Sequence, residues 1–241
     1  MTNSTAVRSF DRRLFAIVAI AFPLLVLAGF ARTYYLKLYF GGPALPSLVV
    51  HAHGLLMTAW VGLFATQVWL ISSRRVRVHQ RLGYAGIGLA ALIVLVGLLT
   101  ALRAGKYGSP STPPDVPTIV FMAVPLFDLV MFSLLFGGAV YYRKRAVAHK
   151  SLMLLTAINF LPPAVGRIPV AALQNLGPLW FFGFPSVLIL LCLFIDWRRR
   201  GQLNYVFLAG GLLLIASYPI RLAVMGTGAW MRFASWATSF V

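Results

Sequence analysis

Residues 74–83 read RRVRVHQRLG, and residues 143–153 read RKRAVAHKSLM. Each stretch sets a cluster of basic residues between two long apolar runs, and basic loops stay on the cytoplasmic side of a membrane. Two further basic clusters precede the first apolar run and follow the sixth. Together the four clusters hold 14 of the 21 basic residues. They are Arg8, Arg12 and Arg13; Arg74, Arg75, Arg77 and Arg81; Arg143, Lys144, Arg145 and Lys150; and Arg198, Arg199 and Arg200.

The apolar runs outline the expected spans. A helix needs about 20 residues to cross the hydrocarbon layer of a bilayer, and each apolar run has about that length. The basic clusters fill every second gap, so the pattern predicts an all-α polytopic membrane bundle of seven transmembrane helices, with the N-terminus cytoplasmic and the C-terminus outside. Residues 1–241 are expected to form a single integral membrane domain. The runs lie near residues 14–31, 46–72, 82–102, 118–142, 151–173, 178–196 and 203–224.

The composition restricts the partners. Hydrophobic residues make up 60% of the chain and charged residues only 10%, which is atypical of a soluble domain. The net charge of +17 would indicate nucleic acid in a soluble protein. Here the charge gathers at the expected membrane borders, where it orients the chain and meets anionic headgroups. We therefore expect the lipid bilayer as partner and no nucleic acid.

The two opening stretches resemble each other. Both contain a basic cluster, then a His, then a Leu three residues later, at the start of a span that runs outward. The match predicts that spans 2–3 and 4–5 are related helical hairpins. His79 and His149 should then lie at similar depth, and their rings would face one another if the two helices are neighbours. A lipid phosphate would also suit these helix N-termini.

Ionisable residues inside the spans are the other functional candidates, because such groups are costly in a membrane. His51 and His53 fall in the outer half of span 2, Asp128 midway along span 4, and Arg167 and Arg221 near the outer ends of spans 5 and 7. One interpretation is a packing ion pair between Asp128 and one of the two arginines. The alternative is a small-anion pocket, open to the outer face, that all five residues line.

Several function classes do not fit the sequence. His51 and His53 are two residues apart, so on a helix they point about 200° apart and cannot chelate one metal ion. We expect His53 to face the bundle and His51 an interface. No Lys lies in an expected span, which excludes a retinal Schiff base, and no G-x-S-x-G elbow is present.

Three stretches carry a resemblance to known proteins. RTYYLKLYFG (residues 32–41), HAHGLLMTAW (51–60) and HKSLM (149–153), with Arg167, are similar to a widespread family of uncharacterised bacterial seven-span membrane proteins. More remotely, the pattern resembles transmembrane b-type cytochromes of the ascorbate-linked ferric reductase type. The resemblance implies the inner membrane of a bacterium as location and a four-helix core at about 46–173.

The cytochrome resemblance also implies a cofactor. In such a core, His79 and His149 would be the axial ligands of one haem b, and bis-His ligation suits electron transfer. His53 would be the span 2 candidate for a second haem, but span 4 holds no His to pair with it. The leading expectation is therefore a one-haem electron-transfer protein with a redox or membrane-complex partner. The alternatives are a small-anion carrier or sensor and a structural accessory subunit.

Overall fold

The computed structural model describes residues 4–42, 47–110, 112–113 and 115–241, and the side chains of residues 4–13 are not described. The side chains of Arg8, Arg12 and Arg13 and the first residue of the expected second span therefore lie outside the described part of the chain. Within that part the secondary structure is entirely helical. The helices are α1 (Ser4–Phe30), continued by the π-helical turn η1 (Ala31–Tyr35), α2 (Leu48–Ser72), α3 (Val76–Tyr107), α4 (Thr118–Phe121), α5 (Ala123–Tyr141), α6 (Ala146–Asn159), α7 (Pro162–Val165), α8 (Ala171–Gln174), α9 (Pro178–Arg200), α10 (Tyr205–Val224) and α11 (Gly228–Thr238).

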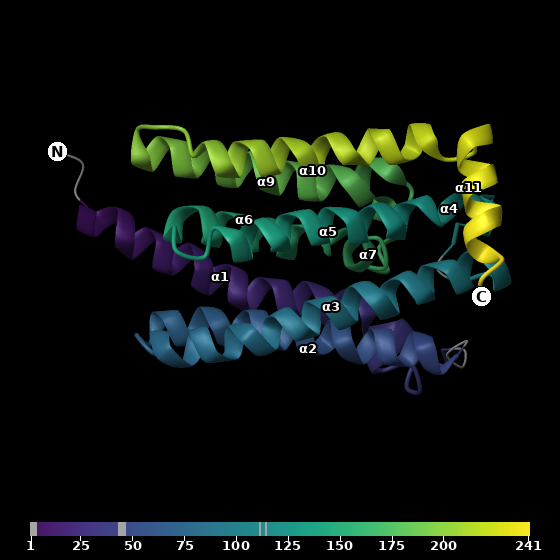
Figure 1. The fold of residues 1–241 in the computed structure, drawn as a ribbon, viewed down its shortest axis with the longest axis horizontal. Coiled ribbons are helices and arrows are strands. Elements are labelled where there is room, and N and C mark those ends of the chain that lie inside the picture. The colour runs from purple at the N-terminus through teal and green to yellow at the C-terminus, as the bar shows by residue number, and fades with distance from the viewer. Residues whose placement is uncertain (1–3, 43–46, 111, 114) are drawn as a thin grey trace.

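The long helices run side by side in a bundle, and α11 lies across one end of it (Figure 1). Among the described residues, six helical segments are long and apolar enough to cross a membrane, which confirms an all-helical, multi-pass architecture. They coincide with six of the seven predicted spans. They are Leu14–Tyr35, Leu48–Ser72, Val76–Tyr107, Thr118–Tyr141, Pro178–Arg200 and Tyr205–Val224.

The predicted fifth span, at 151–173, is not one long helix. Helix α6 has 14 residues and so extends only about 21 Å, less than the hydrocarbon thickness of about 30 Å. It ends just before Pro162 and Pro163, which cannot continue the hydrogen-bond ladder of a helix. The short helix α7 follows, and the backbone between the two is irregular. The count of seven spans and the orientation of the termini remain predictions.

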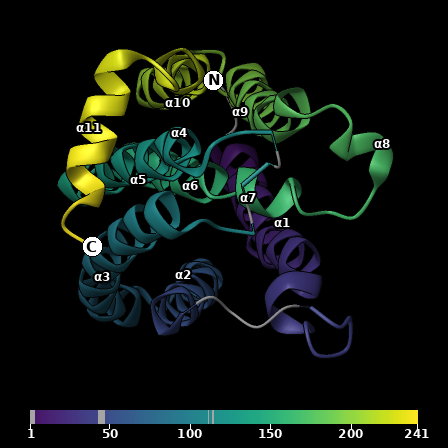
Figure 2. The ribbon, with the colours of Figure 1, turned by 90° about the vertical axis from the view of Figure 1, so that its right-hand side faces the viewer.

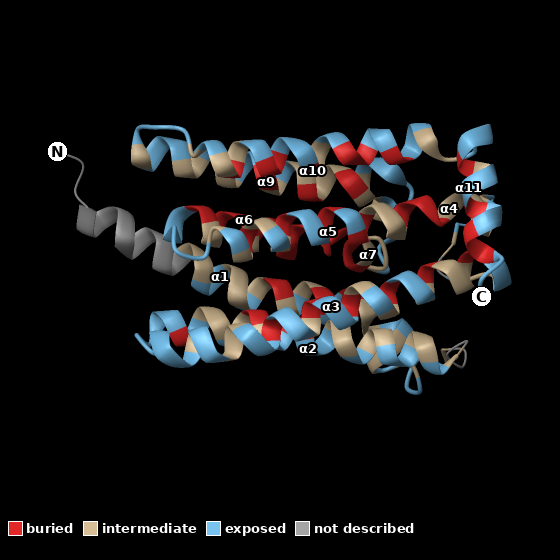
Figure 3. Ribbon diagram, in the orientation of Figure 1, coloured by how far each residue is buried: buried red, intermediate tan, exposed pale blue. Residues whose placement is uncertain are grey.

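This broken segment is the most enclosed part of the protein. Between residues 151 and 165 every residue except Met153 and Pro163 is buried. Viewed along the bundle, α5, α6 and α7 lie in the middle, surrounded by the other helices (Figure 2), and the buried residues gather on them (Figure 3). Irregular backbone is tolerated at membrane depth where protein covers it, so the surrounding helices make this break possible.

Helices α1 and α7 touch at a glycine. A Cβ atom built on Gly29 would lie 2.1 Å from the backbone oxygen of Ala164, which is itself fully buried. Because the atoms of both helices at this contact belong to the backbone, no side chain can move aside to make room for a Cβ atom. The absence of a side chain at position 29 therefore sets the distance between α1 and the broken segment.

We expect Gly29→Ala to destabilise the protein by about 1–3 kcal/mol, because overpacking forces backbone shifts. The matched control is Gly62→Ala on α2, where an added Cβ would meet nothing within 4 Å. Alanine is the better helix former there, so this change should be neutral or slightly stabilising. Unfolding of both variants in detergent micelles measures the difference, and equal stability would contradict the proposed contact.

Candidate functional site

His79 and His149 occupy equivalent places on two helices. Each is the fourth residue of its helix, α3 or α6, after a turn rich in basic residues. The backbone N–H of His79 donates to the carbonyl of Arg75, and that of His149 donates to the carbonyl of Arg145. The ring centres lie 6.2 Å apart with an interplanar angle of 83°. The prediction that the two imidazoles meet is confirmed.

A backbone carbonyl fixes the orientation of the His149 ring. Its Nδ1 lies 2.8 Å from the backbone oxygen of Ala139 on α5. Because a carbonyl oxygen only accepts hydrogen bonds, Nδ1 must carry the proton. In the neutral ring, Nε2 then keeps a free lone pair, which is the arrangement found in histidines that bind metals through Nε2.

The partner ring lies beside an amide. Gln67, near the end of α2, donates a hydrogen bond from Nε2 to the backbone oxygen of His79 at 3.2 Å. Its Oε1 and the Nδ1 of His79 are both buried and have no hydrogen-bond partner among the described residues. Two buried polar atoms without partners thus occur on residues that contact each other. Nothing in the sequence pattern indicates that Gln67 lies against His79.

His51 and His53 lie at the other end of α2. His51 is exposed and contacts Tyr34, whose hydroxyl lies 3.4 Å from its Nδ1. Gly54 permits this approach, because a Cβ there would lie 2.5 Å from the Tyr34 ring. His53 is half-buried, and its Nδ1 lacks a partner within the described structure. The prediction that His53 faces the bundle is therefore confirmed, and an interface at His51 stays a prediction.

Asp128 and Arg221 form an ion pair inside the bundle. The Arg221 side chain is fully buried, and its Nη1 donates to Asp128 Oδ1 at 2.5 Å. Its Nε and Nη2 donate to the backbone oxygen and the hydroxyl of Ser217, one helical turn earlier on α10. Asn159 of α6 donates to the backbone oxygen of Asp128 at 3.0 Å. The pairing interpretation is thus confirmed, with Arg221 as the partner.

The five residues of the expected anion pocket do not gather in one place. Arg167 donates to the backbone oxygen of Pro163 at 2.5 Å and lies over the ring of Phe30. Arg221 is instead engaged with Asp128, and His51 contacts Tyr34. Asp128 and Arg221 are thus engaged with each other, and an anion pocket at Arg167 and His53 stays a prediction.

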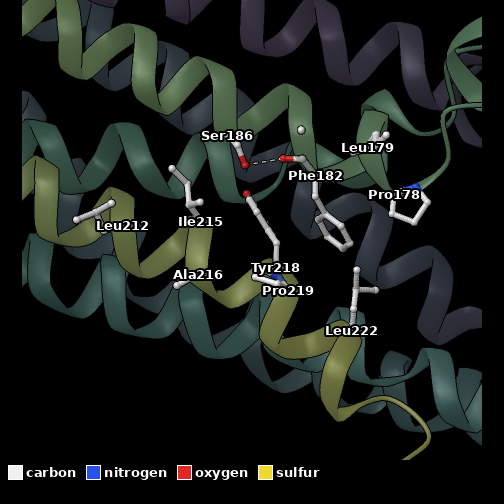
Figure 4. Close-up of a pocket in the computed structure, with 11 residues that line it drawn as sticks. Pro178, Leu179, Phe182, Ser186, Leu212, Ile215, Ala216, Tyr218, Pro219 and Leu222 are labelled. Carbon is white, nitrogen blue, oxygen red and sulfur yellow. Dashed lines mark hydrogen bonds between the residues drawn. The ribbon is translucent and has the colours of Figure 1, made fainter.

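A groove opens between α9 and α10 beside the ion pair (Figure 4). It has a volume of about 500 Å³ and an almost entirely apolar lining. The ring of Tyr218 stacks on Phe182 with centres 4.8 Å apart and also lies against the Arg221 guanidinium. In the wall, Ser186 Oγ donates to the backbone oxygen of Phe182. These aromatic rings separate the ion pair from the groove.

Other candidate groups are sparse. Within the described residues, no group of three or more His, Cys, Asp or Glu side chains could hold a metal ion. Comparison with known proteins adds no assignment, because no family model, curated protein or solved structure matches the chain. The fold and the site together define a multi-pass helical membrane protein whose most distinctive polar feature is a pair of opposed histidines.

Proposed function

We propose that this chain is a seven-span protein of the bacterial inner membrane that binds one b-type haem between His79 and His149 and acts in electron transfer. The proposal rests on one observation, the distance of 6.2 Å between the ring centres of His79 and His149. Two imidazole nitrogens bonded to one metal ion, at about 2.0–2.1 Å each, place their ring centres roughly 6 Å apart. Two rings in direct edge contact have a similar spacing, so an optical spectrum must decide.

The donor chemistry supports the same proposal. The hydrogen bond between His149 Nδ1 and the Ala139 carbonyl leaves Nε2 of His149 free for iron. For His79, we propose that Oε1 of Gln67 accepts a hydrogen bond from Nδ1 in the same way. When bound, a bis-His haem exchanges single electrons and leaves no iron position open for substrate.

The location of the pair bears on the role. Basic clusters flank both histidines, so the positive-inside rule places the pair near the cytoplasmic surface, with the N-terminus inside and the C-terminus outside. His53 is 14 residues from Gln67 on the same helix, about 21 Å away along the axis, and does not share this site. One haem at one face does not carry electrons across the bilayer, so we expect a redox or membrane-complex partner.

The test is the visible spectrum of the purified protein after expression with ample haem supply. We expect a Soret band, a sharp α band on reduction and extraction of non-covalent haem b. A colourless preparation with an intact fold would refute haem binding and would leave the anion and accessory-subunit alternatives as the remaining hypotheses.

A second prediction concerns Gln67. Gln67→Leu removes the amide beside His79 and should raise the reduction midpoint, because a weaker acceptor at Nδ1 makes the imidazole a poorer donor to oxidised iron. Gln67→Glu should lower it for the opposite reason. We expect shifts of up to about 60 mV, the one-electron equivalent of a tenfold change in an equilibrium constant.

Potentiometric titration followed by absorbance measures these shifts. The control is Gln80→Leu, the same substitution at an exposed position one residue after His79. A midpoint unchanged in both Gln67 variants would show that the amide does not act on the ligand.

A further inference from the structure

Helix α11 carries three distinct faces. With 3.6 residues per turn, its residues separate into a buried row, an aromatic row and a polar row. The buried row packs on α3 and α4, and the Trp230 indole N–H donates to the Ile119 carbonyl at 3.0 Å. That row comprises Trp230, Ala234, Ala237 and Thr238. The helix is therefore fixed to the end of the bundle by one face only.

The aromatic row is exposed. Phe233 and Trp236 on α11 and Phe240, two residues beyond the end of the helix, are 45%, 61% and 70% accessible. Their rings form a continuous series, with centres 6.1 Å apart for Phe233 and Trp236 and 5.1 Å apart for Trp236 and Phe240. An exposed row of large aromatic rings usually marks a surface that another apolar phase covers.

The polar row lies on the remaining side. Arg232, Ser235 and Ser239 are all exposed, and on the helical wheel they sit about 100° from the centre of the aromatic row. Helices with separate apolar and polar sides lie in the plane of a membrane interface, with the apolar side in the headgroup and acyl boundary. Trp and other amphipathic rings are enriched at that level.

The position of α11 matches such a role. It crosses the ends of the bundle helices instead of running along them (Figure 1). It packs at the end where α3 stops and α4 begins, the side that lacks the basic clusters. Apolar side chains of α3 are also exposed, with Leu95 63% and Leu98 41% accessible.

We propose that α11 is an interfacial helix whose aromatic row inserts into the headgroup and acyl boundary of the outer leaflet, with the polar row facing water. The bilayer is the partner of this face. This role is independent of haem binding, because α11 lies at the bundle end opposite to the one at which His79 and His149 begin their helices.

Spin labels on single cysteines test the proposal in phosphatidylcholine vesicles, in a Cys192→Ala background. Phe233→Cys and Trp236→Cys label the aromatic row, and Arg232→Cys and Ser235→Cys label the polar row. We expect the aromatic-row labels to collide mainly with oxygen and the polar-row labels mainly with a water-soluble nickel chelate, so the logarithm of the collision ratio changes sign between rows.

Two outcomes would overturn the proposal. Equal collision with the nickel chelate on both rows would place α11 in water. Spin–spin broadening of the aromatic-row labels would mean that a second copy of the chain covers this face. A second measurement keeps an aromatic ring at position 236: brominated lipid should quench tryptophan fluorescence less in Trp236→Phe than in the unmodified protein, and unchanged quenching would also contradict insertion.

Discussion

Asp128→Ala destabilises the protein by about 3–5 kcal/mol, because it leaves the Arg221 guanidinium buried without its carboxylate. Arg221 is fully enclosed and Asp128 only 6% accessible, so water cannot replace the lost partner. The hydrogen bonds to Ser217 remain but do not neutralise the charge. Phe182 and Tyr218 offer only their ring faces to the guanidinium. We expect this variant to have the largest effect on stability of any single substitution considered.

Unfolding of detergent-solubilised protein measures the effect, and two variants control it. Asp196→Ala breaks the other described ion pair, Asp196–Arg200, which is partly exposed at the end of α9. Such pairs contribute about 0.2–1 kcal/mol, so the loss should be small. The double variant Asp128→Leu/Arg221→Met removes both charges and should recover much of the stability. If Asp128→Ala were no worse than Asp196→Ala, the buried pair would not hold the bundle together.

The sequence predicted the spans well because membrane thickness sets a length that apolar runs must meet. It did not predict the break at residues 151–173, where the run is apolar enough but Pro162 and Pro163 interrupt the helix. Hydropathy measures composition and does not register whether a backbone can stay helical. The interruption survives because neighbouring helices bury it, and burial depends on contacts between segments distant in the sequence.

The site was predictable only in part. The repeated His and Leu after basic clusters predicted His79 and His149 at one depth, and the structure shows that the two rings meet. The partner of Asp128 could not be chosen, because Arg167 and Arg221 lie at similar expected depth. The spacing of four residues between Ser217 and Arg221 was a usable signal, since side chains four apart meet on a helix. The contact between Gln67 and His79 could not be predicted, because it depends on tertiary packing.

His149→Gly should abolish the Soret band, because it deletes one of the two iron ligands that we propose. Removing even a residue behind a metal ligand weakens binding about 10–100-fold, so loss of the ligand itself should exceed that. His79→Gly should behave alike, and the double variant should add little, because the two rings act as a unit. Absorbance per mole of protein after purification gives the measurement.

The neighbouring histidines and an added ligand separate loss of binding from loss of fold. His51→Ala and His53→Ala should keep the band, because both residues lie at the far end of α2, where His51 contacts Tyr34. Free imidazole should restore absorbance in His149→Gly by entering the space that the ring left beside Ala139. A misfolded variant would not recover in this way. Retention of the full band in either single glycine variant would show that the ring pair holds no haem, because iron bound elsewhere would not depend on it.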